Sequence, residues 1–187
     1  AGDDFLDNVV KIVQTFVVAS ALLAGASNTG ACEFVYISLD GENRIAVYSV
    51  DESSGELTAV ANVKTPSHPG GLTSDPKNRF LYASLRRAGK LASFRINQDG
   101  GLTLINVVAA GADPAYVATD RTGRFLLTAY YVAAKVAVHQ IGKDGSISEK
   151  PLQEIATDIK AHAIMMDASN RFAFVPHTGP NAIYQFR

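Results

Sequence analysis

Apolar and polar positions alternate in short segments over most of the chain, and turn-forming residues separate these segments. FLYASL (80–85), KLASFRI (90–96) and LTLINVV (102–108) each show the period-two pattern of a pleated strand. Asp, Asn, Gly and Pro stand between them, where the chain has to reverse its direction. Helical spacing is not sustained anywhere after Glu33, so the pattern predicts an all-β domain over residues 34–187.

The strands recur in a unit of about 46 residues, which is the length of one four-stranded propeller blade. Corresponding segments open on a phenylalanine at spacings of 46, 45 and 47, at Phe34, Phe80, Phe125 and Phe172. An Asp-x-x-x-Arg turn precedes the last three, at Asp75–Arg79, Asp120–Arg124 and Asp167–Arg171. A β-sandwich would not explain this regular return, so we predict a β-propeller with four-stranded blades.

The predicted propeller is partial. Residues 34–187 hold about 3.3 such units, whereas closed propellers have roughly four to eight blades. The ring is therefore expected to be completed by a missing carboxy-terminal half or by a partner chain. Unpaired strand edges at both ends would favour such an association.

An apolar leader, residues 1–32, precedes the repeats, and we expect it to be helical. Phe16–Ala26 has the length of a signal-peptide core, and Val9–Ala26 could form a marginal membrane-spanning helix. Alternatively, its valines form the apolar side of a helix packed on a partner. A genuine leader implies membrane contact through residues 1–32 and a periplasmic or membrane-associated protein; otherwise the cytoplasm is expected.

Composition narrows the function classes. The chain of 187 residues has a formal net charge of −1 and is 47% hydrophobic, which suits a soluble domain with a substantial core. Without a basic excess, nucleic acid is not an expected partner. Cys32 is the one cysteine, so the chain can form no internal disulfide and no Cys-x-x-Cys metal motif. Common phosphate-loop, dinucleotide, zincin and serine-elbow motifs are absent, and no cofactor is predicted.

The order of strands in a blade predicts which residues meet at one face, here called the upper face. Inner strands begin there and second strands end there. The inner-strand starts align Gly70, Ala115 and His162. The second-strand ends bring Arg86, Arg87, Tyr130, Tyr131 and His177 to the same rim. A concave rim with a few convergent polar groups is typical of a ligand site.

Three successive units resemble the lactonase family of seven-bladed propellers, typified by bacterial 6-phosphogluconolactonase. They are HPGGLTSDPKNRFLYASLRRAGKLASFRI, DPAYVATDRTGRFLLTAYYVAAKVAVHQI and KAHAIMMDASNRFAFVPHTGPNAIYQFR. The resemblance implies a ring of about seven blades, of which this chain would supply the amino-terminal half. It places His162, Arg86 and Tyr130 at family site positions. A further family motif, with His-Arg and an acidic residue, falls beyond Arg187.

The candidate residues have distinct expected roles. His162 suits a general base that activates water, because the unperturbed pKa of histidine lies near neutrality; otherwise it is a rim residue that bonds a neighbouring loop. Either Arg86 or Arg87 would bind a phosphate or carboxylate, or stabilise an oxyanion. One of Tyr130 and Tyr131 would contact a sugar-like ring while the other packs between blades.

His177 is a candidate second acid or base. With His162 it could also suggest a metal site, but two histidines fifteen apart without a clear third ligand predict no metal. The sequence and the resemblance together predict a hydrolase that opens 6-phosphogluconolactone or a related sugar lactone by water attack. The alternative hypothesis is a non-catalytic propeller segment that serves as a binding or assembly subunit, attached to a membrane through residues 1–32.

Overall fold

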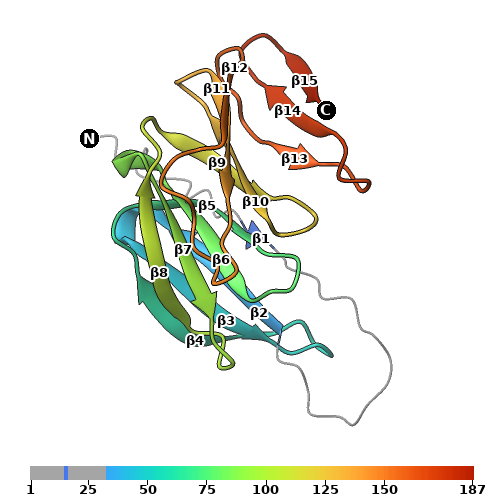
Figure 1. Ribbon diagram of the computed structural model, residues 1–187. Coiled ribbons are helices and arrows are strands. Elements are labelled where there is room, and N and C mark those ends of the chain that lie inside the picture. Colours follow the sequence, from blue (N-terminus) through green and yellow to red (C-terminus); the bar gives the residue numbers. More distant parts are fainter. Residues whose placement is uncertain (1–14, 17–32) are drawn as a thin grey trace, which may run out of the picture.

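Four antiparallel sheets follow one another along the chain in the computed structural model, which describes residues 15–16 and 33–187 (Figure 1). The first blade consists of β1 (Thr15–Phe16), β2 (Glu33–Leu39), β3 (Arg44–Val50) and β4 (Leu57–Lys64). The second consists of β5 (Pro69–Ser74), β6 (Phe80–Leu85), β7 (Lys90–Ile96) and β8 (Leu102–Ala109). The third consists of β9 (Pro114–Thr119), β10 (Phe125–Tyr130), β11 (Lys135–Gln140) and β12 (Gln153–Ala156). The fourth consists of β13 (Met165–Met166), β14 (Ala173–His177) and β15 (Ala182–Phe186).

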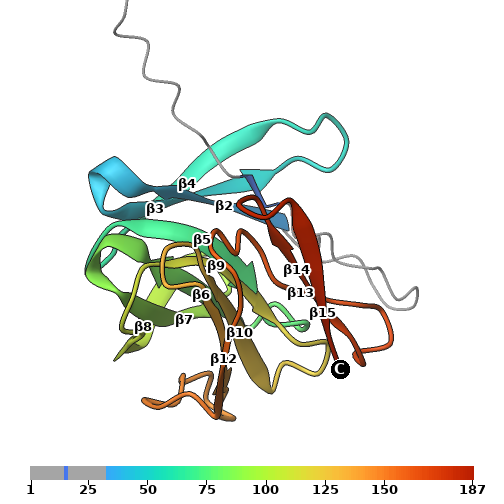
Figure 2. The same ribbon diagram turned by 90° about the horizontal axis from the view of Figure 1, so that it is seen from above.

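This arrangement confirms the predicted all-β partial propeller. Within each sheet the strands lie in sequence order, and the predicted segments 80–85 and 90–96 coincide with β6 and β7. Among the inner strands, β5 contacts β9, and β9 contacts β13. Figure 2 shows the four sheets from above, in the order of the sequence.

The predicted leader falls mostly outside the described residues. Only Thr15–Phe16 belong to them, and they form an extended strand that pairs with Ile37 and Tyr36 in the inner-strand place of the first blade. The helical, signal-peptide and membrane interpretations of the rest concern residues that the structure does not describe. No helix within residues 15–16 and 33–187 is long and apolar enough to cross a membrane. The division into 1–32 and 34–187 stays a prediction.

The hydrophobic core consists of three clusters, one between each pair of successive blades. The cluster between the second and third blades includes Tyr82, Leu91, Leu126 and Tyr130. Equivalent clusters join the first blade to the second and the third to the fourth. Since successive residues of a strand point to opposite faces, each strand contributes alternate residues to the two neighbouring interfaces.

The repeated phenylalanine explains how neighbouring blades approach each other. The ring of Phe34 lies over Gly100, and the ring of Phe80 lies over Gly145, in the turn of the next blade. A Cβ atom on Gly100 would lie 2.4 Å from the Phe34 ring, and one on Gly145 would lie 2.3 Å from the Phe80 ring. Both glycines also have positive φ angles, of 80° and 88°. Each of these two phenylalanines therefore requires a glycine opposite it.

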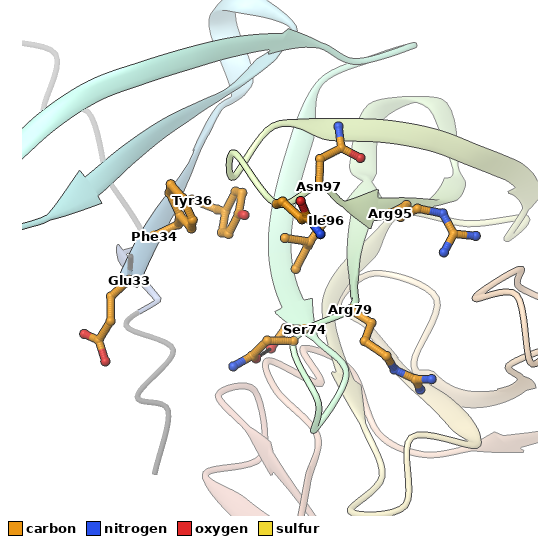
Figure 3. A pocket seen from close by; sticks show the side chains of 10 residues that line it. Glu33, Phe34, Tyr36, Ser74, Arg79, Arg95, Ile96 and Asn97 are labelled. Atoms are coloured by element: carbon orange, nitrogen blue, oxygen red, sulfur yellow. Dashed lines mark hydrogen bonds between the residues drawn. The ribbon is translucent and has the colours of Figure 1, made fainter. Parts of the chain in front are cut away.

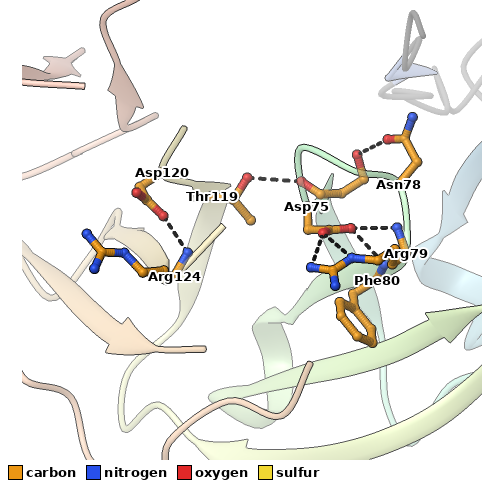
Figure 4. Close-up of polar contacts among 8 residues, drawn as sticks. Asp75, Asn78, Arg79, Phe80, Thr119, Asp120 and Arg124 are labelled. Carbon is orange, nitrogen blue, oxygen red and sulfur yellow. Dashed lines mark hydrogen bonds and ion pairs between the residues drawn. The ribbon is translucent and has the colours of Figure 1, made fainter. Parts of the chain in front are cut away.

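The Asp-x-x-x-Arg turns close the opposite, lower end of the second, third and fourth blades, and Figure 4 shows those of Asp75 and Asp120. The Asp75 carboxylate accepts hydrogen bonds from the backbone N–H groups of Arg79 and Phe80, at 2.6 and 2.9 Å. The same pattern recurs at Asp120 and Asp167. The Thr119 hydroxyl of the third blade donates to the Ser74 carbonyl of the second, at 3.0 Å, which connects the two blades.

The turns of the third and fourth blades lower the pKa of the carboxyl groups of Asp120 and Asp167. Burial by itself would raise the pKa of Asp120, but hydrogen bonds from Thr122, Phe125 and Asn170 hold it below its ordinary value. At Asp75 the Arg79 guanidinium also forms an ion pair with the carboxylate, at 3.0 Å. These contacts give the aspartates of the series a structural role in closing the turns.

We predict that Gly145→Ala destabilises the protein much more than Gly111→Ala. Gly111 has a φ of 82°, but no atom lies within 4 Å of the position that a Cβ atom would take there. Its substitution therefore carries only the backbone cost, about 1–2 kcal/mol. Gly145→Ala adds the clash with Phe80, for a total of about 3–5 kcal/mol. Urea unfolding of both variants measures the difference, and equal losses would contradict this interblade contact.

Candidate functional site

A groove of about 820 Å³ opens on the upper face, where side chains from all four blades converge. The first blade contributes Ser38 and Asp40, and the second contributes Pro69, Gly70, Gly71, Arg86 and Arg87. Asp113, Ala115 and Tyr131 come from the third blade, and His162 from the fourth. The groove is thus a product of blade arrangement rather than of any one local motif.

The inner strands of the second, third and fourth blades each have one extra residue at the upper end. In the second blade Pro69 pairs with Leu85, but Leu72 pairs with Ala83, so one residue on β5 has no counterpart. The third blade shows the same offset in the pairs Pro114–Tyr130 and Tyr116–Ala129, and the fourth shows it in Ala161–His177 and Met165–Phe174. Such bulges bend a strand and re-aim its side chains. The aligned positions Gly70, Ala115 and His162 all fall in these bulges.

Small residues keep the inner wall of the groove open in the second blade. The backbone N–H of Gly71 donates to the hydroxyl of Ser84, at 2.8 Å. A Cβ atom on Gly70 would lie 2.8 Å from the same hydroxyl oxygen. The buried Ser84 therefore fixes the bulge and leaves no room for a larger residue at Gly70.

His162 presents an exposed imidazole to the groove from a fixed backbone. Its N–H donates to the Pro176 carbonyl at 2.9 Å, and Ala161 bridges to His177. The imidazole meets the ring of Tyr131 edge-on, with 6.0 Å between the ring centroids. The backbone contacts to β14 thus aim this histidine toward the third blade.

The two arginines lie on a single turn of 3-10 helix, η2 (Arg86–Ala88), directly after β6. Gly89 ends this turn with a φ of 59°, and a Cβ atom there would lie 2.9 Å from the Gly111 carbonyl oxygen. The guanidinium of Arg86 lies 5.6 Å from the centre of the Tyr131 ring. Tyr131 therefore contacts both the guanidinium of Arg86 and the imidazole of His162.

Each arginine is bound to a carboxylate of a neighbouring blade. Arg86 donates from Nε and Nη2 to Asp113 Oδ2, at 3.3 and 3.2 Å. Arg87 donates from Nη2 to Asp40 Oδ2, at 2.8 Å. Asp40 directly follows β2 and Asp113 directly precedes β9, so both aspartates lie on the upper rim beside the arginines.

The structure gathers four of the predicted site residues in the groove: His162, Arg86, Arg87 and Tyr131. It does not bring Tyr130 there. Tyr130 is the last residue of the β10 ladder and is fully buried between the second and third blades, with Lys135 Nζ 4.9 Å from its ring centre. Burial raises the pKa of its hydroxyl.

His177 also lies outside the groove. It is 3% exposed, its Nδ1 is 3.0 Å from the Val175 carbonyl oxygen, and its ring centroid lies 4.4 Å from that of Tyr184. Since its backbone pairs with Ala161, it supports the strand that carries His162 rather than facing the groove. Within residues 33–187, His, Cys, Asp and Glu form no group of three that could hold a metal ion.

A second hollow, of about 420 Å³, lies between the first and second blades at their lower end (Figure 3). Phe34, Tyr36 and Ile96 form its walls, while Arg79 and Arg95 extend away from it in Figure 3. The Tyr36 hydroxyl donates to the Gly100 carbonyl, and burial, with the negative charge of Asp99, raises its pKa to about 12. This hollow holds no histidine and no predicted site residue, so the upper groove is the stronger candidate.

Comparison with known proteins assigns the chain to a family. The family described as lactonase, 7-bladed beta-propeller, matches residues 35–187. The chain therefore belongs to this lactonase family, as its three repeat units indicated.

Individual relatives agree with this assignment. The 6-phosphogluconolactonase of Bacillus subtilis (strain 168) is 40% identical over 69 residues, which are 36% of this chain and 20% of that protein. The periplasmic gluconolactonase of Pseudomonas aeruginosa superposes with a TM-score of 0.73 at 22% identity, over 83% of this chain and 50% of that one. A Bacteroides fragilis protein provisionally named 6-phosphogluconolactonase gives a TM-score of 0.76 at 21% identity, over 87% and 50%.

At 21% and 22% identity the structural likenesses show the fold alone. The chain spans at most half the length of each of these relatives.

We predict that Ser84→Ala destabilises the protein by about 1–3 kcal/mol, because the buried N–H of Gly71 loses its acceptor. Thr128→Val is the matched control. The Thr128 hydroxyl is buried and has no hydrogen-bond partner in the described part of the chain, so its removal should be neutral or stabilising. Free energies of unfolding in urea measure both effects, and equal changes would refute the role of Ser84.

Proposed function

We propose that the upper groove belongs to a site that opens 6-phosphogluconolactone or a related sugar lactone by attack of water. The observation that carries this proposal is the exposed imidazole of His162, aimed into a groove that also holds Arg86 and Tyr131. Membership of the lactonase family supports the reaction class. The names of the relatives support a sugar lactone as the substrate.

In this proposal His162 acts as the general base. It takes a proton from a water molecule as the water oxygen attacks the lactone carbonyl carbon, which yields a tetrahedral intermediate. The intermediate collapses by breaking the bond between that carbon and the ring oxygen. The protonated imidazole then returns the proton to the departing ring oxygen, and the product is the open hydroxy acid.

Arg86 stabilises the oxygen that becomes negatively charged in the intermediate. A guanidinium has five N–H donors, and Asp113 accepts from two of them, one on Nε and one on Nη2. The remaining donors can face the developing oxyanion, whose stabilisation is commonly the largest catalytic contribution in acyl transfer. The two bonds to Asp113 hold the guanidinium in one orientation, so little reorganisation is needed when the negative charge develops on the oxyanion.

Tyr131 takes the ring-contacting role that the resemblance gave to Tyr130. Its ring contacts both Arg86 and His162, and its hydroxyl is 3.4 Å from that of Thr178. A sugar ring stacked on this face would have its carbonyl carbon between the base and the guanidinium. Arg87, held by Asp40, borders the same space.

We predict that His162→Ala lowers kcat/KM for D-glucono-1,5-lactone opening by about 10²- to 10⁴-fold, because the general base is lost. The measurement is acid release in a pH-stat, corrected for the spontaneous reaction. His68→Ala is the control, since His68 is a loop residue 3.3 Å from the Ser67 hydroxyl and does not line the groove. The proposal fails if the unaltered protein does not exceed the spontaneous rate. It also fails if His162→Ala keeps the kcat/KM of the unaltered protein.

A further inference from the structure

The charged side chains that line the upper groove cancel one another. They are Arg86, Arg87, Asp40 and Asp113, and they form two ion pairs with N–O distances of 3.2 and 2.8 Å. A groove adapted to a phosphorylated ligand would be expected to leave a guanidinium unpaired for the phosphate, since bidentate Arg–phosphate contacts supply much of the affinity. Here both guanidinium groups already face a carboxylate.

The two pairs are held in place by different blades. Arg86 and Arg87 share one turn of the second blade, but Arg86 reaches forward to Asp113 of the third and Arg87 reaches back to Asp40 of the first. Asp40 directly follows β2 and Asp113 directly precedes β9, so each carboxylate belongs to a different blade from the arginine that it pairs with. Asp113 is the more sheltered, with 26% of its side chain exposed against 44% for Asp40.

This arrangement penalises a doubly charged phosphate. To reach Arg86 or Arg87, the phosphate must displace a carboxylate or approach it within a few ångströms. Like charges at such distances repel each other, most strongly at low ionic strength. An uncharged sugar ring meets no such repulsion. Its hydroxyl groups can donate to the carboxylates and accept from the guanidinium groups, so that both members of each pair are used.

We propose that Asp40 and Asp113 determine specificity, and direct the groove to uncharged sugar lactones rather than to their phosphorylated counterparts. This inference rests on the proposed function and narrows its substrate class. It is compatible with oxyanion stabilisation by Arg86, because the oxyanion is a single charge that exists only during the reaction, whereas a phosphate dianion is present throughout binding.

The test uses two stable ligands that differ only in the phosphate: D-glucono-1,5-lactam, in which a ring N–H replaces the hydrolysable ring oxygen, and its 6-phosphate. Titration of the 187-residue protein by NMR or calorimetry at low ionic strength should show the uncharged lactam bound at least as tightly as the phosphate. In the double variant Asp40→Asn/Asp113→Asn, affinity for the phosphate should rise about tenfold or more. Affinity for the uncharged lactam should not rise, because asparagine keeps an acceptor oxygen for a sugar hydroxyl but makes a weaker hydrogen bond than a carboxylate does.

Glu154→Gln is the matched control. It removes a carboxylate that pairs with Lys135 at 2.6 Å and is 45% exposed, but that lies on β12 and does not line the groove. It should change neither affinity. A tenfold preference of the unaltered protein for the phosphate, or an unchanged preference in the double variant, would overturn this inference and leave the proposed function intact. If neither lactam bound any of these proteins, both proposals would fall.

Discussion

Packing of each blade on the next sets the geometry of the whole chain. Phe34 lies over Gly100 and Phe80 over Gly145, and the absence of a side chain on these glycines decides how closely the sheets approach. The upper groove depends on this spacing because its residues come from different blades. Arg86, Tyr131 and His162, which are in contact, belong to three successive blades. A change in blade packing would therefore alter the site without touching any residue in it.

A second constraint acts at the upper end of the inner strands. The one-residue bulge is the same in the second, third and fourth blades, but it carries Gly70, Ala115 and His162 in turn. The first two leave the groove open and the third supplies an imidazole. The same bulge thus leaves space in the groove at the second and third blades and positions an imidazole in it at the fourth. The ion pairs of Arg86 and Arg87 connect neighbouring blades at the upper groove.

Much of this could be predicted from the sequence because the repeat is carried by residues with strict local roles. The aspartates of the lower turns accept backbone N–H bonds, and the phenylalanines need their glycines, so both recur at a fixed spacing. The choice between Tyr130 and Tyr131 could not be made, because it depends on where the β10 ladder ends. Nor could the pairing of Arg86 with Asp113, which joins residues 27 apart across two blades. His177 has the same position in the repeat as Leu85 and Tyr130, which are buried between blades. The burial of His177 in the structure, and not its sequence, shows that it is a packing residue too.

A crystal structure of the protein with D-glucono-1,5-lactam tests the position of the site most directly. We predict the lactam ring against Tyr131, its carbonyl oxygen within hydrogen-bond distance of Arg86, and His162 close to the carbonyl carbon with room for one water molecule between them. A lactam seated instead against Phe34 and Tyr36 in the lower hollow, or bound on the upper face without contact to His162, would contradict the site proposed for this chain.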